Sequence, residues 1–278
     1  MKSQNVKPHE QEPTEASIKD FINSSRKMTE DDVKNAPTLL VEEINGDLLN
    51  HQTIKITASG MINGRNANDG IVIFSLKNPL LNNDTRTNNT NTFKADFELN
   101  YNESGISYPF IFLIYYCRET KEYLIRAYSG QDSDNKILFI KLSGYHHILK
   151  QRELISAGNM IFQINITDDK NLEITNLSCK DNNGAIMKEV FKYNETTEVS
   201  IGRDSKCTIA FPKDKSFSRI QTTFLFDEKE KQWRVIDGSR SKSSTNGTWI
   251  FGTHSFPIKD QMIVGVLTSK LKFTLVKN

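Results

Sequence analysis

Residues 244–249 read Ser-Thr-Asn-Gly-Thr-Trp and follow the alternating segment Gln-Trp-Arg-Val at 232–235. An Asn-Gly pair after hydroxyl residues predicts a tight turn, which leaves side-chain oxygens and amides facing outward. Upstream, residues 201–203 read Ile-Gly-Arg, with the arginine expected at the end of a strand. An arginine fork beside such a turn can form a shallow site for a doubly charged, oxygen-rich group such as phosphate. The pattern favours binding over catalysis.

Short alternating segments continue through most of the chain. Apolar and polar residues alternate at 97–99, 123–125, 232–235 and 271–276, and no long amphipathic helix is evident after residue 40. Period two with intervening turn signals is typical of half-buried strands, so we expect an all-β fold. Residues 1–40 are polar and carry Pro8 and Pro13 near their start, which favours a disordered or partner-ordered tail.

The chain also contains an internal similarity. The segments 62–73, 120–125 and 133–138 resemble 201–210, 230–235 and 244–249, respectively. The spacing from Asn135 to Phe162 equals that from Asn246 to Phe273, and the surplus of the first copy falls near an Asn/Thr-rich run at 78–92. Surface loops accept insertions at low cost. We therefore predict two tandem domains, at 45–168 and 172–277, although chance resemblance between short strands is the alternative.

Composition limits the function. Lys and Arg number 36 against 34 Asp and Glu, giving a net charge of +2, so no basic field favours nucleic acid. The scattered cysteines Cys117, Cys179 and Cys207 form no CxxC pair, which favours reduced thiols inside the cell. Whether the location is nucleus, cytoplasm or cytoskeleton, including the cilium, is left open.

We expect no secretory signal and no membrane segment, because the N-terminus lacks an apolar run and the longest apolar stretch, 108–117, is half of the ~20 residues that a spanning helix needs. No nucleophile–base pair or metal-ligand spacing stands out. We therefore expect no enzyme, no metal and no cofactor.

The second copy resembles the forkhead-associated (FHA) domain, a β-sandwich whose loops at one end recognise phosphothreonine. The resemblance covers roughly 172–277 and is carried by Gly202-Arg203, Ser218-Arg219-Ile220-Gln221 and Thr245-Asn246-Gly247 in that order. Each dipeptide is common, but their order and spacing together are fairly specific.

The resemblance implies a phosphopeptide site. Its residues would be Arg203, Ser218, Arg219, Thr245 and Asn246. Gly202 and Gly247 would serve the loop backbones, the latter at a positive φ. The histidine usual in the family is replaced by Gln221, whose two donors and one acceptor can still hold the loops.

The first copy is a degenerate member by the same comparison. Tyr108-Pro109 stands where Ser218-Arg219 stands in the second copy, and Lys136 replaces the turn glycine, although Arg65 and Asn135 remain. We expect it to pack or dock, and not to read phosphate.

The sequence thus predicts a non-enzymatic adaptor whose C-terminal domain binds phosphorylated proteins. The alternative is a constitutive, phosphate-independent component of a larger assembly.

Overall fold

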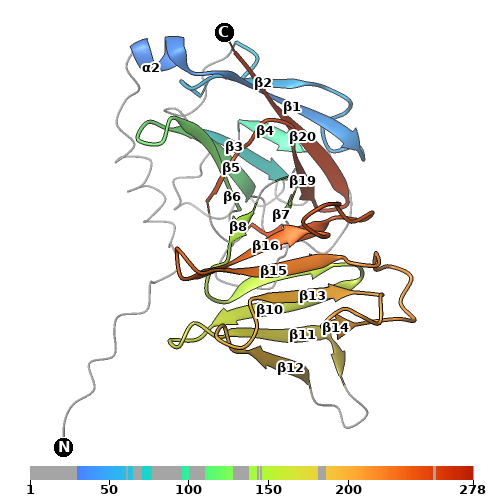
Figure 1. The fold of residues 1–278 in the computed structure, drawn as a ribbon. Coiled ribbons are helices and arrows are strands. Elements are labelled where there is room, and N and C mark those ends of the chain that lie inside the picture. The colour runs from blue at the N-terminus through green and yellow to red at the C-terminus, as the bar shows by residue number, and fades with distance from the viewer. Residues whose placement is uncertain are drawn as a thin grey trace, which may run out of the picture.

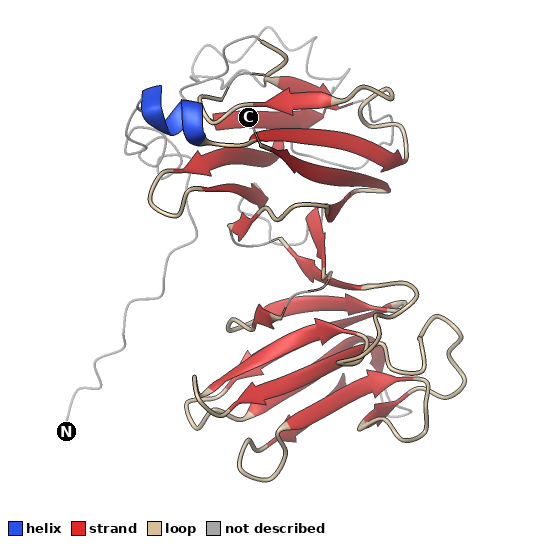
Figure 2. Ribbon diagram, turned by 45° about the horizontal axis from the view of Figure 1, so that its top comes forward, coloured by secondary structure: helices blue, strands red, loops and turns tan. Residues whose placement is uncertain are grey.

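The computed structural model describes residues 30–60, 62–64, 71–76, 96–99, 110–127, 138–142, 144, 146–180, 186–252 and 255–277. Within them nearly all regular structure is β-strand, arranged as two bodies (Figure 1, Figure 2), which confirms the predicted all-β class. The exception is the short helix α2 (Glu30–Asn35).

The body that contains the C-terminus is a sandwich, which we call the N-terminal sandwich. One layer has the order β7-β19-β20-β1-β2 and the other the order β18-β6-β5-β3-β4. The bounds of the first layer are β7 (Leu138–Lys141), β19 (Met262–Val266), β20 (Ser269–Val276), β1 (Thr38–Asn45) and β2 (Ile54–Ile56). Those of the second are β18 (Phe256–Pro257), β6 (Glu122–Ala127), β5 (Phe110–Cys117), β3 (Ile71–Leu76) and β4 (Phe97–Leu99).

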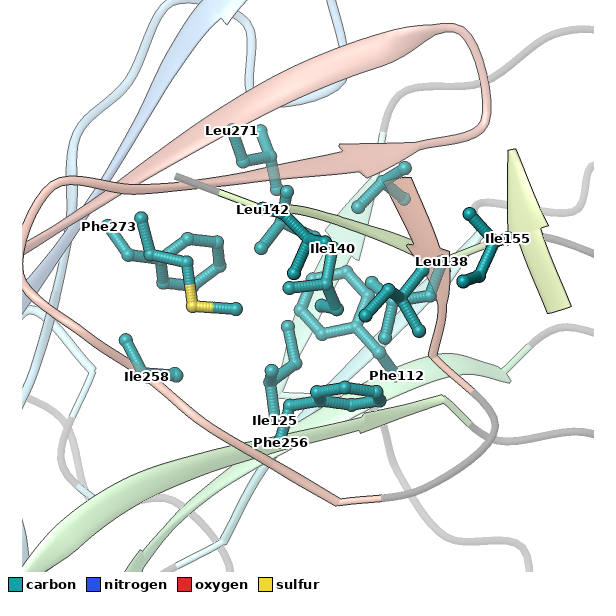
Figure 3. Packing of buried hydrophobic residues seen from close by; sticks show 14 of the residues in the cluster. Phe112, Ile125, Leu138, Ile140, Leu142, Ile155, Phe256, Ile258, Leu271 and Phe273 are labelled. Carbon is teal, nitrogen blue, oxygen red and sulfur yellow. The ribbon is translucent and has the colours of Figure 1, made fainter. Parts of the chain in front are cut away.

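Apolar side chains from both layers meet between them. Figure 3 shows Phe112 and Ile125 from one layer packed near Ile140 and Phe273 from the other, and all four are at most 1% exposed. Burial of these alternating residues is the dominant favourable term for such a fold.

The other body, the C-terminal sandwich, consists of one continuous stretch, residues 147–251. Its layers have the orders β12-β11-β10-β9-β17 and β14-β13-β15-β16-β8. The first layer is formed by β12 (Ile186–Phe191), β11 (Leu172–Lys180), β10 (Met160–Ile166), β9 (Glu153–Ala157) and β17 (Thr248–Phe251). The second is formed by β14 (Ile209–Ala210), β13 (Glu198–Gly202), β15 (Thr222–Asp227), β16 (Gln232–Asp237) and β8 (His147–Ile148).

Strands β7 and β17 join the two bodies. They pair antiparallel, with Ile140 opposite Ile250, so that one layer of each sandwich belongs to a single ten-stranded sheet. Both isoleucines are fully buried. The junction is therefore part of the hydrophobic core and not a flexible linker.

The two predicted copies each contribute their last two strands to the sandwich of the other. Hairpin β9–β10, from the first copy, lies between β17 and β11 of the second, while hairpin β19–β20 lies between β7 and β1 of the first. Phe162 on β10 and Phe273 on β20 occupy equivalent positions in the two copies, and both are fully buried. The predicted ranges 45–168 and 172–277 thus each supply strands to both sandwiches. The exchange is possible because the hairpins β9–β10 and β19–β20 are equivalent, so that each can occupy the corresponding position in either sandwich.

The predicted tail needs a second correction. Residues 30–40, assigned to it, form α2 and the start of β1, because Leu39 and Val41 are fully buried and β1 pairs with both β2 and β20. Residues 1–29 and the Asn/Thr-rich run at 78–92 lie outside the described residues. Among the described residues, no helix has the length and apolar content to span a membrane.

The exchange makes a prediction about fragments. The fragment 146–252 contains every strand of the C-terminal sandwich, and we expect a monomer with a cooperative melting transition. The fragment 170–252 lacks both β9–β10 and the equivalent hairpin β19–β20, so we expect it not to fold as a stable monomer. Size-exclusion chromatography and thermal denaturation by circular dichroism would compare them. Failure of 146–252 to fold on its own would contradict the exchange.

Candidate functional site

Three loops meet at one end of the C-terminal sandwich, and Ser218 connects them. The loops span 203–208, 211–221 and 238–247. The backbone N–H of Arg203 donates to the Ser218 carbonyl at 3.0 Å, and the backbone N–H of Thr245 donates to Ser218 Oγ at 2.9 Å. Three of the residues predicted for the site are therefore held together by direct hydrogen bonds.

Asn246 is fixed through a fourth loop that the sequence did not indicate. Its Nδ2 donates to the Ser216 carbonyl at 2.8 Å, and Ser216 Oγ accepts from the backbone N–H of Asn159 at 3.1 Å. Asn159 lies in the turn between β9 and β10, beside Gly158 with φ +57°. A turn from the first copy thus supports the loop that holds Asn246. Because strand exchange creates this contact between residues far apart in the sequence, no local sequence pattern predicts it.

Gln221 ties the loops together beneath the surface. It is 0% exposed; its Oε1 accepts from the Ser218 backbone N–H at 3.0 Å, and its Nε2 donates to Ser244 Oγ at 2.8 Å and to the Gly247 carbonyl at 2.7 Å. Each polar atom of the side chain is therefore satisfied. Gln221 thus links the loop of Ser218 to the turn that contains Ser244 and Gly247.

A buried polar network continues below Gln221. Asp237 Oδ1 accepts from Ser244 Oγ at 2.6 Å and lies 3.0 Å from Thr248 Oγ1, whose oxygen is 2.8 Å from Thr222 Oγ1. Thr222 and Thr248 are fully buried. These residues were not predicted from the sequence. They are polar residues in strands that are otherwise apolar, and that pattern does not show which side chains they bond to.

Gly202 and Gly247 are required to be glycine for different steric reasons. A Cβ on Gly202 would lie 2.2 Å from the Arg219 carbonyl oxygen, so any side chain there would push the two loops apart. Gly247 has φ +81°, and a Cβ there would lie 2.5 Å from Cε of Lys141. The first glycine allows a close approach and the second allows a left-handed backbone.

Two arginines give the rim its free positive charge. Arg203 and Arg219 are exposed, and within the described part of the chain no hydrogen bond or ion pair engages either guanidinium. The nearby Asp204 and Asp214 carboxylates instead accept backbone N–H groups of Lys206 and Ser216 at 3.0 and 2.8 Å. The acidic groups therefore stabilise turns and leave the arginines available to an anion.

Cys207 supports the loop that carries Arg219. Its Sγ donates to the Arg219 carbonyl at 3.2 Å, and it is 8% exposed. Burial raises the pKa of the Cys207 thiol above its usual value, so the thiol remains protonated as a donor near neutral pH. This cysteine is structural.

The described residues contain no group of three or more His, Cys, Asp or Glu side chains that could hold a metal ion. The first-copy equivalents Arg65, Tyr108, Pro109, Asn135 and Lys136 lie outside the described residues.

Comparison with known families identifies the region of the site. Residues 199–264 match the family model described as the FHA domain, which supports an FHA domain in this part of the chain; members of that family are protein-interaction modules. The match begins in β13 and ends in β19, and so includes strands of both sandwiches. No curated protein and no solved structure was found to match.

Gln221 offers a test of the network. Gln221→Ala would leave the Ser218 N–H and the Gly247 carbonyl without their buried partner, and an unsatisfied buried polar group costs about 1–3 kcal/mol. We expect the free energy of unfolding to fall by about that amount in urea denaturation. Gln52→Ala, at an exposed loop residue that within the described part of the chain forms a hydrogen bond through its backbone alone, should change this free energy by less than about 0.5 kcal/mol. Equal effects would show that Gln221 does not hold the loops.

Proposed function

We propose that the C-terminal sandwich binds phosphothreonine-containing segments of partner proteins and that the chain acts as a non-enzymatic adaptor. The observation that carries the proposal is the convergence of Arg203, Ser218, Thr245 and Asn246 from separate loops, within a region that matches the FHA family.

The donors suit a phosphate group. The Arg203 guanidinium offers a planar fork of N–H groups, and charge-assisted bonds of this kind are about twice as strong as neutral ones. Ser218 Oγ already accepts from Thr245, so its hydroxyl hydrogen is directed elsewhere and can reach a phosphate oxygen. Arg219 adds a second cation at the rim. A dianionic, oxygen-rich ligand matches this set.

Asn246 and Thr245 would hold the backbone of the bound segment. The Asn246 side chain is positioned by its bond to Ser216, which leaves Oδ1 as an acceptor for a peptide N–H. Because Gln221 fixes the backbones of both loops from below, little loop order remains to be gained on binding. This pre-organisation supports recognition in the absence of the usual histidine.

The direct test is a titration of matched peptide libraries with a central threonine, phosphorylated or not, followed by fluorescence anisotropy. We expect binding of the phosphorylated library alone, because the two rim arginines have no other anionic partner in the described residues. Equal binding of both libraries, or of neither, would contradict the proposal. Partners that co-purify after phosphatase treatment would then favour the constitutive scaffold.

Arg203→Ala separates recognition from folding. Loss of a charge-assisted bond costs about 1.5–3 kcal/mol, so we expect binding of the phosphorylated library to weaken by about ten- to a hundredfold. The free energy of unfolding should change by less than about 0.5 kcal/mol, because the side chain is exposed. Lys229→Ala removes the same charge from the turn between β15 and β16, whereas the site loops 211–221 and 238–247 adjoin the other ends of these two strands. This variant should leave binding unchanged. A large loss of stability in Arg203→Ala would show that Arg203 is structural.

A further inference from the structure

Two lysines flank the partly exposed ring of Trp249, on the outer face of the ten-stranded sheet. Lys141 Nζ lies 5.9 Å and Lys270 Nζ 5.7 Å from the ring centroid. Both distances are within the range of a cation–π interaction. Lys141 belongs to β7 of the first copy, Trp249 to β17 of the second, and Lys270 to the exchanged strand β20. We call these three residues the lysine–tryptophan cluster.

The cluster adjoins the phosphate site. Trp249 Nε1 donates to the Asn246 carbonyl at 3.1 Å, and the Lys141 side chain packs against Gly247, where a Cβ would lie 2.5 Å from its Cε. Both contacts are with the turn that contributes Thr245 and Asn246. A segment held at that turn therefore lies next to the two ammonium groups.

The charges of the cluster are not neutralised by the protein. In the part of the chain that the structure describes, neither Lys141 nor Lys270 forms an ion pair. On the neighbouring strand β1, Glu43 is engaged by the backbone N–H groups of Leu48 and Leu49 at 2.7 and 3.0 Å. Two like charges held at one ring without a counter-ion favour an anion from outside.

The pairing of β7 with β17 fixes the arrangement. Trp249 is directly opposite Lys141 in the register, and its ring reaches toward Gly265 on β19, where a Cβ would lie 3.4 Å from the ring. The absence of a side chain at Gly265 lets the ring lie over the sheet toward β20, on which Lys270 is opposite Gly265. The ammonium groups are thus positioned before a ligand binds, and this pre-organisation reduces the entropic cost of binding.

From this geometry we propose that the lysine–tryptophan cluster is an anion subsite, which binds an acidic side chain, carboxylate or phosphate, that flanks the phosphothreonine of the bound segment. This inference rests on the proposed function and gives it a specificity: the chain prefers phosphothreonine with an acidic flank. It also gives the first copy a part in recognition, through Lys141.

The experiment uses the full chain and three phosphothreonine peptide libraries. The first has Asp and Glu on the N-terminal side of the phosphothreonine, the second has them on the C-terminal side, and the third has Asn and Gln on both sides. Exposed ion pairs contribute about 0.2–1 kcal/mol each, so we expect one acidic library to bind about two- to tenfold more tightly than the amide library. Equal affinities for all three would overturn the subsite while leaving the phosphothreonine site intact.

The double variant Lys141→Met, Lys270→Met removes the charges and keeps apolar stems on the ring and on Gly247. We expect it to bind the acidic and amide libraries equally, with the wild-type melting temperature. Lys55→Met, an exposed lysine on β2 of the same sheet, should keep the acidic preference. An acidic preference that persists in the double variant would overturn the proposal, whereas failure of all three libraries to bind the wild type would overturn the proposed function itself.

Discussion

The pairing of β7 with β17 is the constraint on which the rest of the structure depends. Each of these strands ends the layer contributed by its own sandwich, and the unpaired backbone groups of such an edge would invite association with other chains. Pairing Ile140 with Ile250 removes both edges and places the isoleucines in one continuous core. The site loops of the second copy are thereby held against strands of the first, so the two sandwiches act as one scaffold for a single binding end.

Rigidity at that end comes from buried polar groups. Gln221 and Asp237 each accept or donate several hydrogen bonds at 8% exposure or less. In a low-dielectric interior a fully satisfied network of this kind specifies one geometry, whereas a missing partner is costly. The backbones of the rim loops are therefore fixed, although their side chains are exposed and charged. A binding site for a solvated dianion needs fixed loops that carry exposed cationic side chains, because these side chains face water before the ligand binds.

The sequence predicted the local features of the fold well. Period two predicted the all-β class, and the Thr-Asn-Gly turn, Gly-Arg and the Gln221 loop predicted the region that matches the FHA family model, because each pattern depends on neighbouring residues. The exchange of hairpins could not be predicted. Phe162 and Phe273 are equivalent in the repeat and equally buried, so either hairpin satisfies the same core. The contacts of Asn159 with Ser216 and of Lys141 with Gly247 follow from that choice and were missed with it.

Exchange also gives the first copy, which we predict to be degenerate, a structural role in the C-terminal sandwich. Its hairpin β9–β10 lies inside that sandwich, and its strand β7 completes the shared sheet. Loss of the first copy would remove core strands from the second. Two first-copy residues also contact the site loops directly, because the Asn159 backbone N–H donates to Ser216 Oγ and the Lys141 side chain packs against Gly247.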